Sequence, residues 1–303
     1  MSSQGRRTGI RMPVPAAVLL LGLAACTRTS VPVGSTPGLA VPEAPLSPLT
    51  TGIPFGFGQP TEIIYAVAWV GEGEELALRD PAGISGTVLT SFQPDKVGVQ
   101  LTGNATFLGS SLWVQVESPA GAGWVNSWNL TEYIAPNDFC NDPRVVPLMQ
   151  AFIQAVISQD GAALQAVANP KRGLVLRYDW WNPEVVIDYQ ALPGLFADRT
   201  VHEWGARDSM GSPIEGTFSE VILPPLAQVL QGAPTVTCGS LITGSTARPA
   251  RWPSEYVNLN YYAFYRRDAT SETGFNWRAW ALGFEYLEGQ PFLTLVVQYR
   301  GEV

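Results

Sequence analysis

One segment gathers the side-chain types that general acid–base catalysis uses. Residues 201–213 hold His202, Glu203, Asp208 and Ser209 between several glycines. A base, an acid and a hydroxyl of this kind transfer protons when they converge on one site. However, the serine lies in no Gly-x-Ser-x-Gly turn, and no spacing pairs it with the histidine. We therefore expect these residues to pack as a loop or to contact a ligand rather than to catalyse.

A second group of polar side chains lies on a predicted strand over residues 256–265. Asn258 and Asn260 share one face of that strand with Tyr256, Tyr262 and Phe264. If this face is the inside of a curved sheet, it lines a pocket for a polar ligand. If it is the outside, it is a solvated surface, and we favour this second interpretation.

The sequence has few features that would indicate binding of a metal, a cofactor or nucleic acid. The chain has one histidine among 303 residues, and its carboxylates lack the regular spacing of a calcium loop. No glycine-rich phosphate loop with a following lysine occurs. The formal net charge of −8 would repel nucleic acid. We expect no cofactor, no metal and no nucleic-acid partner.

The N-terminal 26 residues have the layout of an export signal. Arg6, Arg7 and Arg11 precede an apolar run over residues 14–25, which is too short to span a bilayer. Cleavage after this run would change the formal net charge from −8 to −11, because it removes these three arginines and no acid.

The end of this signal, Leu23-Ala24-Ala25-Cys26, resembles the lipobox of bacterial lipoproteins. The resemblance implies cleavage before Cys26 and attachment of diacylglycerol to its sulfur. We therefore expect a lipid-anchored, extracytoplasmic protein of the cell membrane or envelope, with acyl chains holding it to the membrane.

Two cysteines remain in the body of the chain. Outside the cytoplasm Cys140 and Cys238 are expected to pair, and the alternative is two separately buried thiols. Neither lies in a Cys-x-x-Cys motif, so both interpretations are structural.

Residues 27–59 carry six prolines among glycine, serine and threonine, which is typical of a semi-extended tether. Residues 60–135 then alternate short apolar runs with turns, and this pattern predicts a small, closed or nearly closed β-barrel.

This second segment resembles the bacterial SH3 family. Leu76-Ala77-Leu78-Arg79 before a Pro/Gly turn matches the family's opening motif, and Trp113-Val114-Gln115-Val116 followed by Gly123-Trp124-Val125 matches its closing motif. Ala77 and Asp80 depart from the opening motif. The resemblance implies a binding module for cell-wall peptide or glycan, in which Trp128 is the candidate ligand contact and the other two tryptophans fill the core.

Residues 138–303 are expected to form an α+β domain of no recognised family. Asp142-Pro143 predicts a helix start, Asp160 a second, shorter helix, and Glu288-Gly289-Gln290 the turn of a terminal antiparallel hairpin. The order of elements is similar to the cone-shaped fold of nuclear transport factor 2 and ketosteroid isomerase.

The sequence thus predicts a mainly β chain, in which an SH3-like barrel precedes an α+β domain with a C-terminal antiparallel sheet. The predicted function is non-enzymatic binding of peptidoglycan or of an envelope protein. The alternative is an envelope hydrolase or isomerase that uses His202, Glu203 or Asp208.

Overall fold

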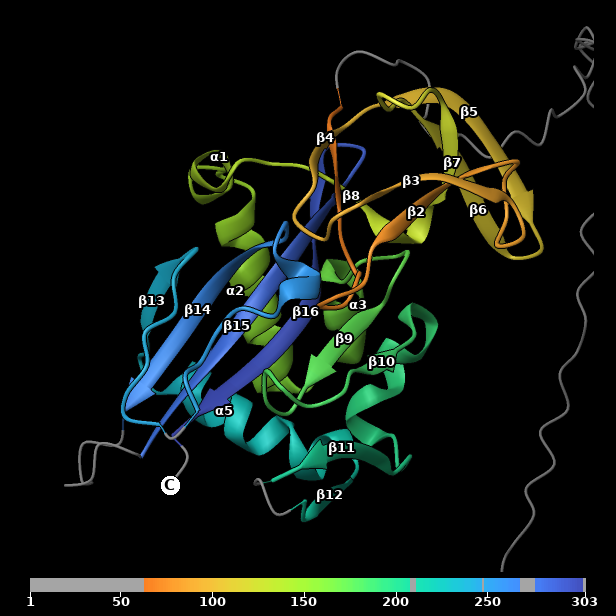
Figure 1. The fold of residues 1–303 in the computed structure, drawn as a ribbon. Coiled ribbons are helices and arrows are strands. Elements are labelled where there is room, and N and C mark those ends of the chain that lie inside the picture. Colours follow the sequence, from red (N-terminus) through yellow and green to blue (C-terminus); the bar gives the residue numbers. More distant parts are fainter. Residues whose placement is uncertain (1–62, 208–210, 247, 268–275, 302–303) are drawn as a thin grey trace, which may run out of the picture. The chain divides into compact units, whose positions relative to one another are not determined.

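The computed structural model describes residues 63–207, 211–246, 248–267 and 276–301. They form a mainly β structure with several sheets (Figure 1). We call residues 63–135 the N-terminal lobe and residues 136–301 the C-terminal domain. The predicted signal, Cys26 and the tether lie outside the described residues. Within the described part of the chain, no helix is both long enough and apolar enough to cross a membrane.

The N-terminal lobe contains two sheets and does not form the closed barrel that we predicted. The first sheet has the order β4-β1-β8 and the second the order β3-β2-β7-β6-β5. Short strands and irregular pairing leave these sheets separate. Within the second sheet, the register between β5 and β6 also shifts, between Leu101 and Ala105. The strands are β1 (Tyr65–Val67), β2 (Leu76–Asp80), β3 (Thr87–Phe92), β4 (Val97–Val99), β5 (Leu101–Leu108), β6 (Ser111–Val116), β7 (Gly123–Asn126) and β8 (Leu130–Glu132).

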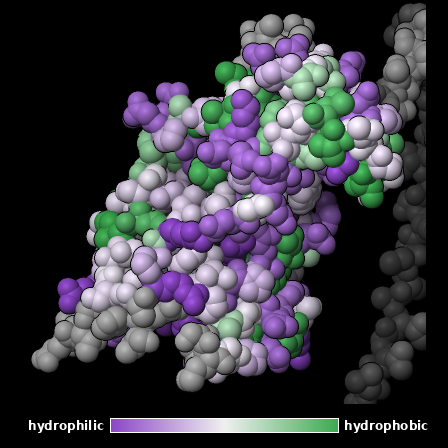
Figure 2. Space-filling model, viewed as in Figure 1, coloured by the Kyte–Doolittle hydropathy of each residue, from purple (hydrophilic) through white to green (hydrophobic). Residues whose placement is uncertain are grey.

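Both sheets of the lobe share one apolar core, which includes Leu78, Val114 and Val125. Trp113 is buried, as predicted, whereas Trp124 is half-buried. Gly123 allows β7 to approach this core, since a Cβ atom there would lie 2.6 Å from Cγ of Leu78. In Figure 2 hydrophobic side chains also reach the surface of the lobe among hydrophilic ones.

The C-terminal domain begins with helices. These are α1 (Pro136–Cys140), α2 (Val145–Ser158) and α3 (Gly161–Val167), and α4 (Phe218–Val221) and α5 (Leu223–Gln231) follow later in the chain. The predicted helix start at Asp142 precedes the observed start of α2 at Val145. Residues 141–144 instead form a turn, in which the Asp142 carboxylate accepts a hydrogen bond from the Arg144 N–H. The second helix begins as predicted, since Asp160 accepts the N–H of Ala163.

The domain is built on a six-stranded sheet of order β10-β9-β16-β15-β14-β13. All neighbours are antiparallel except β16 and β9, which run parallel with Leu295 opposite Val175. The predicted terminal hairpin is confirmed as β15 and β16. The strands are β9 (Leu174–Arg177), β10 (Val185–Ile187), β13 (Thr235–Cys238), β14 (Asn260–Arg267), β15 (Trp277–Leu287) and β16 (Gln290–Arg300), and β11 (His202–Ala206) pairs separately with β12 (Pro213–Gly216).

The two faces of the six-stranded sheet are covered differently. Helices α2, α3 and α5 cover one face (Figure 1), and their apolar side chains pack on residues such as Trp280 and Leu282. The other face is covered by the 3₁₀ turn η3 (Ser254–Tyr256), the loop before it and residues 68–69 of the N-terminal lobe. Both faces of the sheet are therefore buried, and the sheet forms the centre of the fold.

Candidate functional site

A cavity lies between the N-terminal lobe and the tip of the β15–β16 hairpin. Its volume is about 780 Å³, within the range of small-molecule sites. One wall comes from β6, β8 and the 3₁₀ turn η1 (Ser127–Asn129), and the other from the hairpin and residues 170–171. Neither part of the chain encloses this space alone.

Apolar side chains make up much of both walls. Most of these apolar side chains come from the N-terminal lobe. The β15–β16 hairpin supplies two more, one on each side of its turn. An apolar ligand surface would therefore lose contact with water on two sides. The apolar lining residues are Leu101, Leu112, Val114, Leu130, Leu287 and Phe292.

One end of the cavity carries Lys171, which a tight turn after α3 positions. The side-chain oxygen of Asn169 accepts the backbone N–H groups of Lys171 and Arg172 at 2.8 and 3.2 Å. Gly173 completes this turn with φ +71°, and a Cβ atom there would lie 2.1 Å from the carbonyl oxygen of Ile187. The Lys171 ammonium donates to the Ser127 carbonyl at 2.9 Å. Burial and the neighbouring Arg172 lower the pKa of Lys171 to about 8.

Arg172 lies behind this lysine in a buried ion pair. Its Nε donates to the Glu285 carboxylate at 2.6 Å, and one Nη donates to the Trp128 carbonyl at 2.6 Å. The guanidinium carbon lies 4.4 Å from the ring centroids of both Trp69 and Trp128. Two indoles therefore enclose the charged group, which joins the N-terminal lobe to the sheet.

The same carboxylate also receives neutral donors. Glu285 accepts the side-chain N–H groups of Asn169 at 3.0 Å and of Trp69 at 3.2 Å. These bonds offset the cost of removing the ion pair from water. They also fix the Lys171 end of the cavity, because Asn169 holds the turn on which the lysine lies.

Another part of the cavity carries negative charge. The two oxygens of Glu132 accept the backbone N–H groups of Glu288 at 2.6 Å and of Gly289 at 2.9 Å, so this side chain supports the hairpin turn. Tyr65 also lines the cavity. Burial, together with the charges of Glu132 and Glu288, raises the pKa of the Tyr65 hydroxyl.

Trp128 is the one predicted ligand contact that lies beside this site. Its side chain is 44% exposed, as expected for a surface residue. Its ring and carbonyl group hold Arg172, and the Lys171 nitrogen lies 6.0 Å from the ring centroid. Trp128 thus positions the charged end of the cavity, while its neighbours Ser127 and Leu130 line it.

Asn258 and Asn260 do not share a pocket-lining face. Pro253 and the turn η3 delay β14 to Asn260, so Asn258 precedes the strand and donates to the carbonyl groups of Val67 and Pro94. Asn260 donates to the Ile134 carbonyl at 2.7 Å. Both amides thus connect the N-terminal lobe to the C-terminal domain. The expected solvated face is also wrong, because Tyr262 and Phe264 are buried under the helices.

The residues of the alternative enzyme hypothesis lie elsewhere. His202 and Glu203 are neighbours on β11, and adjacent strand residues point to opposite faces. Neither lines the large cavity or a smaller one of about 360 Å³ beside Arg207 and Arg278. Asp208 lies outside the described residues. Over the ranges that the structure covers, no three His, Cys, Asp or Glu side chains are grouped to hold a metal ion.

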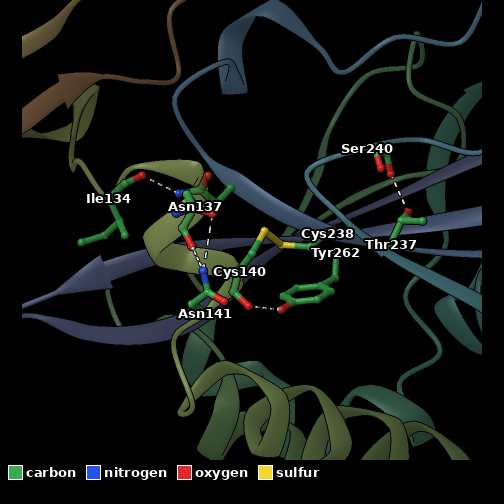
Figure 3. Close-up of a disulfide and its surroundings, with 9 residues drawn as sticks. Ile134, Asn137, Cys140, Asn141, Thr237, Cys238, Ser240 and Tyr262 are labelled. Carbon is green, nitrogen blue, oxygen red and sulfur yellow. Dashed lines mark hydrogen bonds between the residues drawn. A yellow bond between two sulfur atoms is a disulfide. The ribbon is translucent and has the colours of Figure 1, made fainter.

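Cys140 and Cys238 form the predicted disulfide, with Cα atoms 5.9 Å apart (Figure 3). The bond joins the end of α1 to the edge strand β13. The Tyr262 hydroxyl donates to the Cys140 carbonyl at 3.2 Å and adds a contact from the neighbouring strand β14. The bond closes a loop with a sequence separation of 98 residues. Its role is therefore structural.

No protein family, no curated protein and no solved structure matches this chain. The site is therefore interpreted from its own geometry. Sequence reasoning missed its three central charged residues, Lys171, Arg172 and Glu285. The Asn169-Pro170-Lys171-Arg172-Gly173 turn was the available signal, because it places two adjacent cations directly after a helix end.

Proposed function

We propose that this chain is a lipid-anchored, extracytoplasmic, non-enzymatic binding protein. Its ligand is a cell-wall peptide or glycan, or another molecule of the envelope surface. The export-type N-terminus and Cys26 are the basis for the proposed lipid-anchored, extracytoplasmic location. The disulfide is consistent with an oxidising compartment. The observation that carries the binding role is the apolar cavity with charged groups in its walls.

The SH3-like assignment of residues 60–135 is part of this proposal. The two halves of the closing motif lie side by side as β6 and β7, with Val114 opposite Val125. This pairing supports the resemblance, although β6 and β7 belong to a five-stranded sheet and not to a closed barrel. We propose that ligand binding by this module uses the cavity side of β6 and β8.

Point variants test the function better than deletion of the lobe. Trp69 contacts Glu285 and Arg172, and Asn258 contacts two carbonyl groups of the lobe, so removing residues 60–135 would also disturb the sheet. Leu112→Trp instead fills the cavity from β6. Leu108→Trp is the matched control, because Leu108 is exposed on the same β5–β6 hairpin and does not line the cavity.

The measurement is sedimentation of the purified full chain, in mild detergent, with isolated peptidoglycan. We expect Leu112→Trp to lower the retained amount about tenfold, equivalent to about 1.4 kcal/mol, and Leu108→Trp to retain the parent level. Equal retention of both variants, with unchanged thermal unfolding, would overturn the proposed site.

The anchor is tested separately by mass spectrometry of the mature N-terminus. We expect the peptide to begin at Cys26 with the added mass of a diacylglycerol thioether, and a Cys26→Ser variant to leave the membrane fraction. A mature chain that retains Met1, or a bare thiol at position 26, contradicts this part of the proposal.

A further inference from the structure

We infer that two copies of this chain associate through the free edge of β5, with the two β5 strands antiparallel about a two-fold axis at Thr106. This inference goes beyond the proposed function and does not depend on it. Three features of the β5–β6 hairpin support it, namely its unpaired backbone groups, the side chains beside them and its lack of charge.

β5 is the last strand of the five-stranded sheet, and within the described part of the chain no strand lies along its outer edge (Figure 1). A two-residue turn joins β5 to β6, with Leu108 directly opposite Ser111. Residues that flank such a turn exchange hydrogen bonds, and the ladder alternates from there. The N–H and C=O groups of Ala105 and Phe107 therefore point away from β6. Because the pairing is irregular before Ala105, the regular free edge covers residues 105–108.

A second β5 strand suits this edge because the side chains on either side of Thr106 complement each other in size. About a two-fold axis at Thr106, Ala105 of each copy lies opposite Phe107 of the other, so a small side chain faces a large one. Gly103 and Gly109 lie opposite each other in the same way, which leaves the ends of the pairing without side chains that could collide. Such a contact uses the same surface on both copies and closes at a dimer.

Apolar side chains are exposed on both faces of this edge. Phe107 is 58% exposed and lies opposite Leu112, whereas Leu108 is 43% exposed on the other face of β5. Ile84, which is 86% exposed, belongs to a loop beside Leu108, since a Cβ atom at Gly83 would lie 3.0 Å from Cδ1 of that leucine. A strand added along β5 would remove apolar surface from water on both sides of the sheet.

The hairpin also lacks charge. No acidic or basic residue and no proline lies between Lys96 and Glu117. Charged side chains and prolines are the usual means by which an edge strand is kept from pairing with another chain. The whole chain has a formal net charge of −8, which opposes contact between copies over much of its surface. A second copy therefore meets least repulsion at this uncharged edge, whereas a basic partner would be attracted to acidic surface elsewhere.

The first test is a cross-link at the two-fold axis. The N–H and C=O groups of Thr106 point toward β6, so the two copies of this residue form a non-hydrogen-bonded pair with Cα atoms about 4.5 Å apart, within the range of a disulfide. The full chain carrying Thr106→Cys is prepared with Cys26→Ser, which leaves the new thiol as the free one because Cys140 and Cys238 are paired. Mild oxidation by dissolved oxygen should give a covalent dimer on non-reducing electrophoresis.

Val88→Cys in the same background is the matched control, because Val88 is 51% exposed on β3, the other edge strand of the same sheet. It should give about tenfold less covalent dimer than Thr106→Cys at the same protein concentration, since its thiols meet by random encounter. Equal yields from the two positions would overturn the inference.

Sedimentation equilibrium of the Cys26→Ser chain tests association without a new thiol. We expect a monomer–dimer equilibrium, and we expect Phe107→Lys to raise the dissociation constant about tenfold, because it removes apolar contact area from both copies. Val88→Lys should leave the dissociation constant unchanged. A chain that stays monomeric at every concentration, or lysine variants with equal effects, would contradict association through β5.

Discussion

The two faces of the six-stranded sheet are stabilised by different means. On the helix-covered face, α2 contributes Met149 and Phe152 to a core of apolar side chains. On the opposite face, the loop before β14 and the N-terminal lobe are held by arginine side chains and ion pairs. Arg177 bonds to Glu184 at 3.2 Å and to Glu255, and it lies 4.9 Å from the ring centroid of Tyr256.

The difference follows from how the backbone N–H and C=O groups of each layer find hydrogen-bond partners. A helix pairs its own N–H and C=O groups, so apolar burial is enough to hold it on the sheet. An irregular layer needs side chains to fix it. Trp252 illustrates this need, because its ring stacks on Tyr261 at 4.2 Å and occupies the space that the absent side chain of Gly283 leaves.

The largest expected effect tests the helix-covered side. Replacing Cys140 and Cys238 together with serine opens a loop of 98 residues, and it should lower the free energy of unfolding by about 4–5 kcal/mol on the chain-entropy account. Urea unfolding of the parent and the variant measures this loss. A loss below about 1 kcal/mol would mean that α1 and β13 are held by packing alone.

The next effect tests the opposite side. Arg172→Met removes one partner of a buried ion pair and leaves Glu285 without its charge partner, which should cost about 3–4 kcal/mol in unfolding free energy. Adding Glu285→Leu to the same chain should recover most of that loss, because an apolar pair avoids the uncompensated charge. Urea unfolding of the two single variants and the double variant completes the cycle.

If the double variant is instead as unstable as the single one, the indole contacts of Arg172 are the main contribution, and the ion pair is secondary. Arg172→Lys provides the control for charge, since it keeps a cation but loses the planar group between Trp69 and Trp128.

The smallest effect concerns the ion pair of Arg144 with Asp142, in which the arginine side chain is exposed. The guanidinium of Arg144 and the hydroxyl of Tyr286 bond to Asp142 and lower the pKa of its carboxyl to about 2. The folded state thus favours the ionised form. The resulting stability is present above about pH 4, the ordinary pKa, and is lost as pH falls toward 2.

Solvent screening limits this contribution to about 1 kcal/mol. Asp142→Asn should therefore be about 1 kcal/mol less stable than the parent at pH 6, and this difference should be small near pH 2 and vanish below it. Parallel thermal unfolding of both chains across this range measures the difference. A difference that is the same at both pH values would show that the charge of Asp142 contributes nothing.

Local elements could be predicted from the sequence, and the site could not. Asp160 and the Glu288-Gly289-Gln290 turn fixed a helix start and a hairpin, because capping and turn geometry depend on neighbouring residues. The disulfide followed from the count of cysteines and the expected compartment. The cavity instead joins Ser127 to Lys171 and Glu132 to Gly289, and no local pattern relates residues so far apart.

The errors have the same origin. Alternation alone extended β14 back to Tyr256, whereas the contacts of Asn258 with Val67 and Pro94 are tertiary and override it. The barrel prediction came from strand spacing, which carries no information on closure. Sequence patterns therefore described least well the residues that form contacts between the N-terminal lobe and the C-terminal domain.

The parallel pairing of β9 with β16 has a consequence for how the chain reaches its native state. Positions 175 and 295 must meet before the middle of the sheet is complete, whereas the hairpins on either side can form early from nearby residues. Such distant pairing makes folding slow. Until it occurs, β9 and the β15–β16 hairpin each present an unpaired edge that invites aggregation. A chain of this topology would benefit from a chaperone that shields those edges during folding.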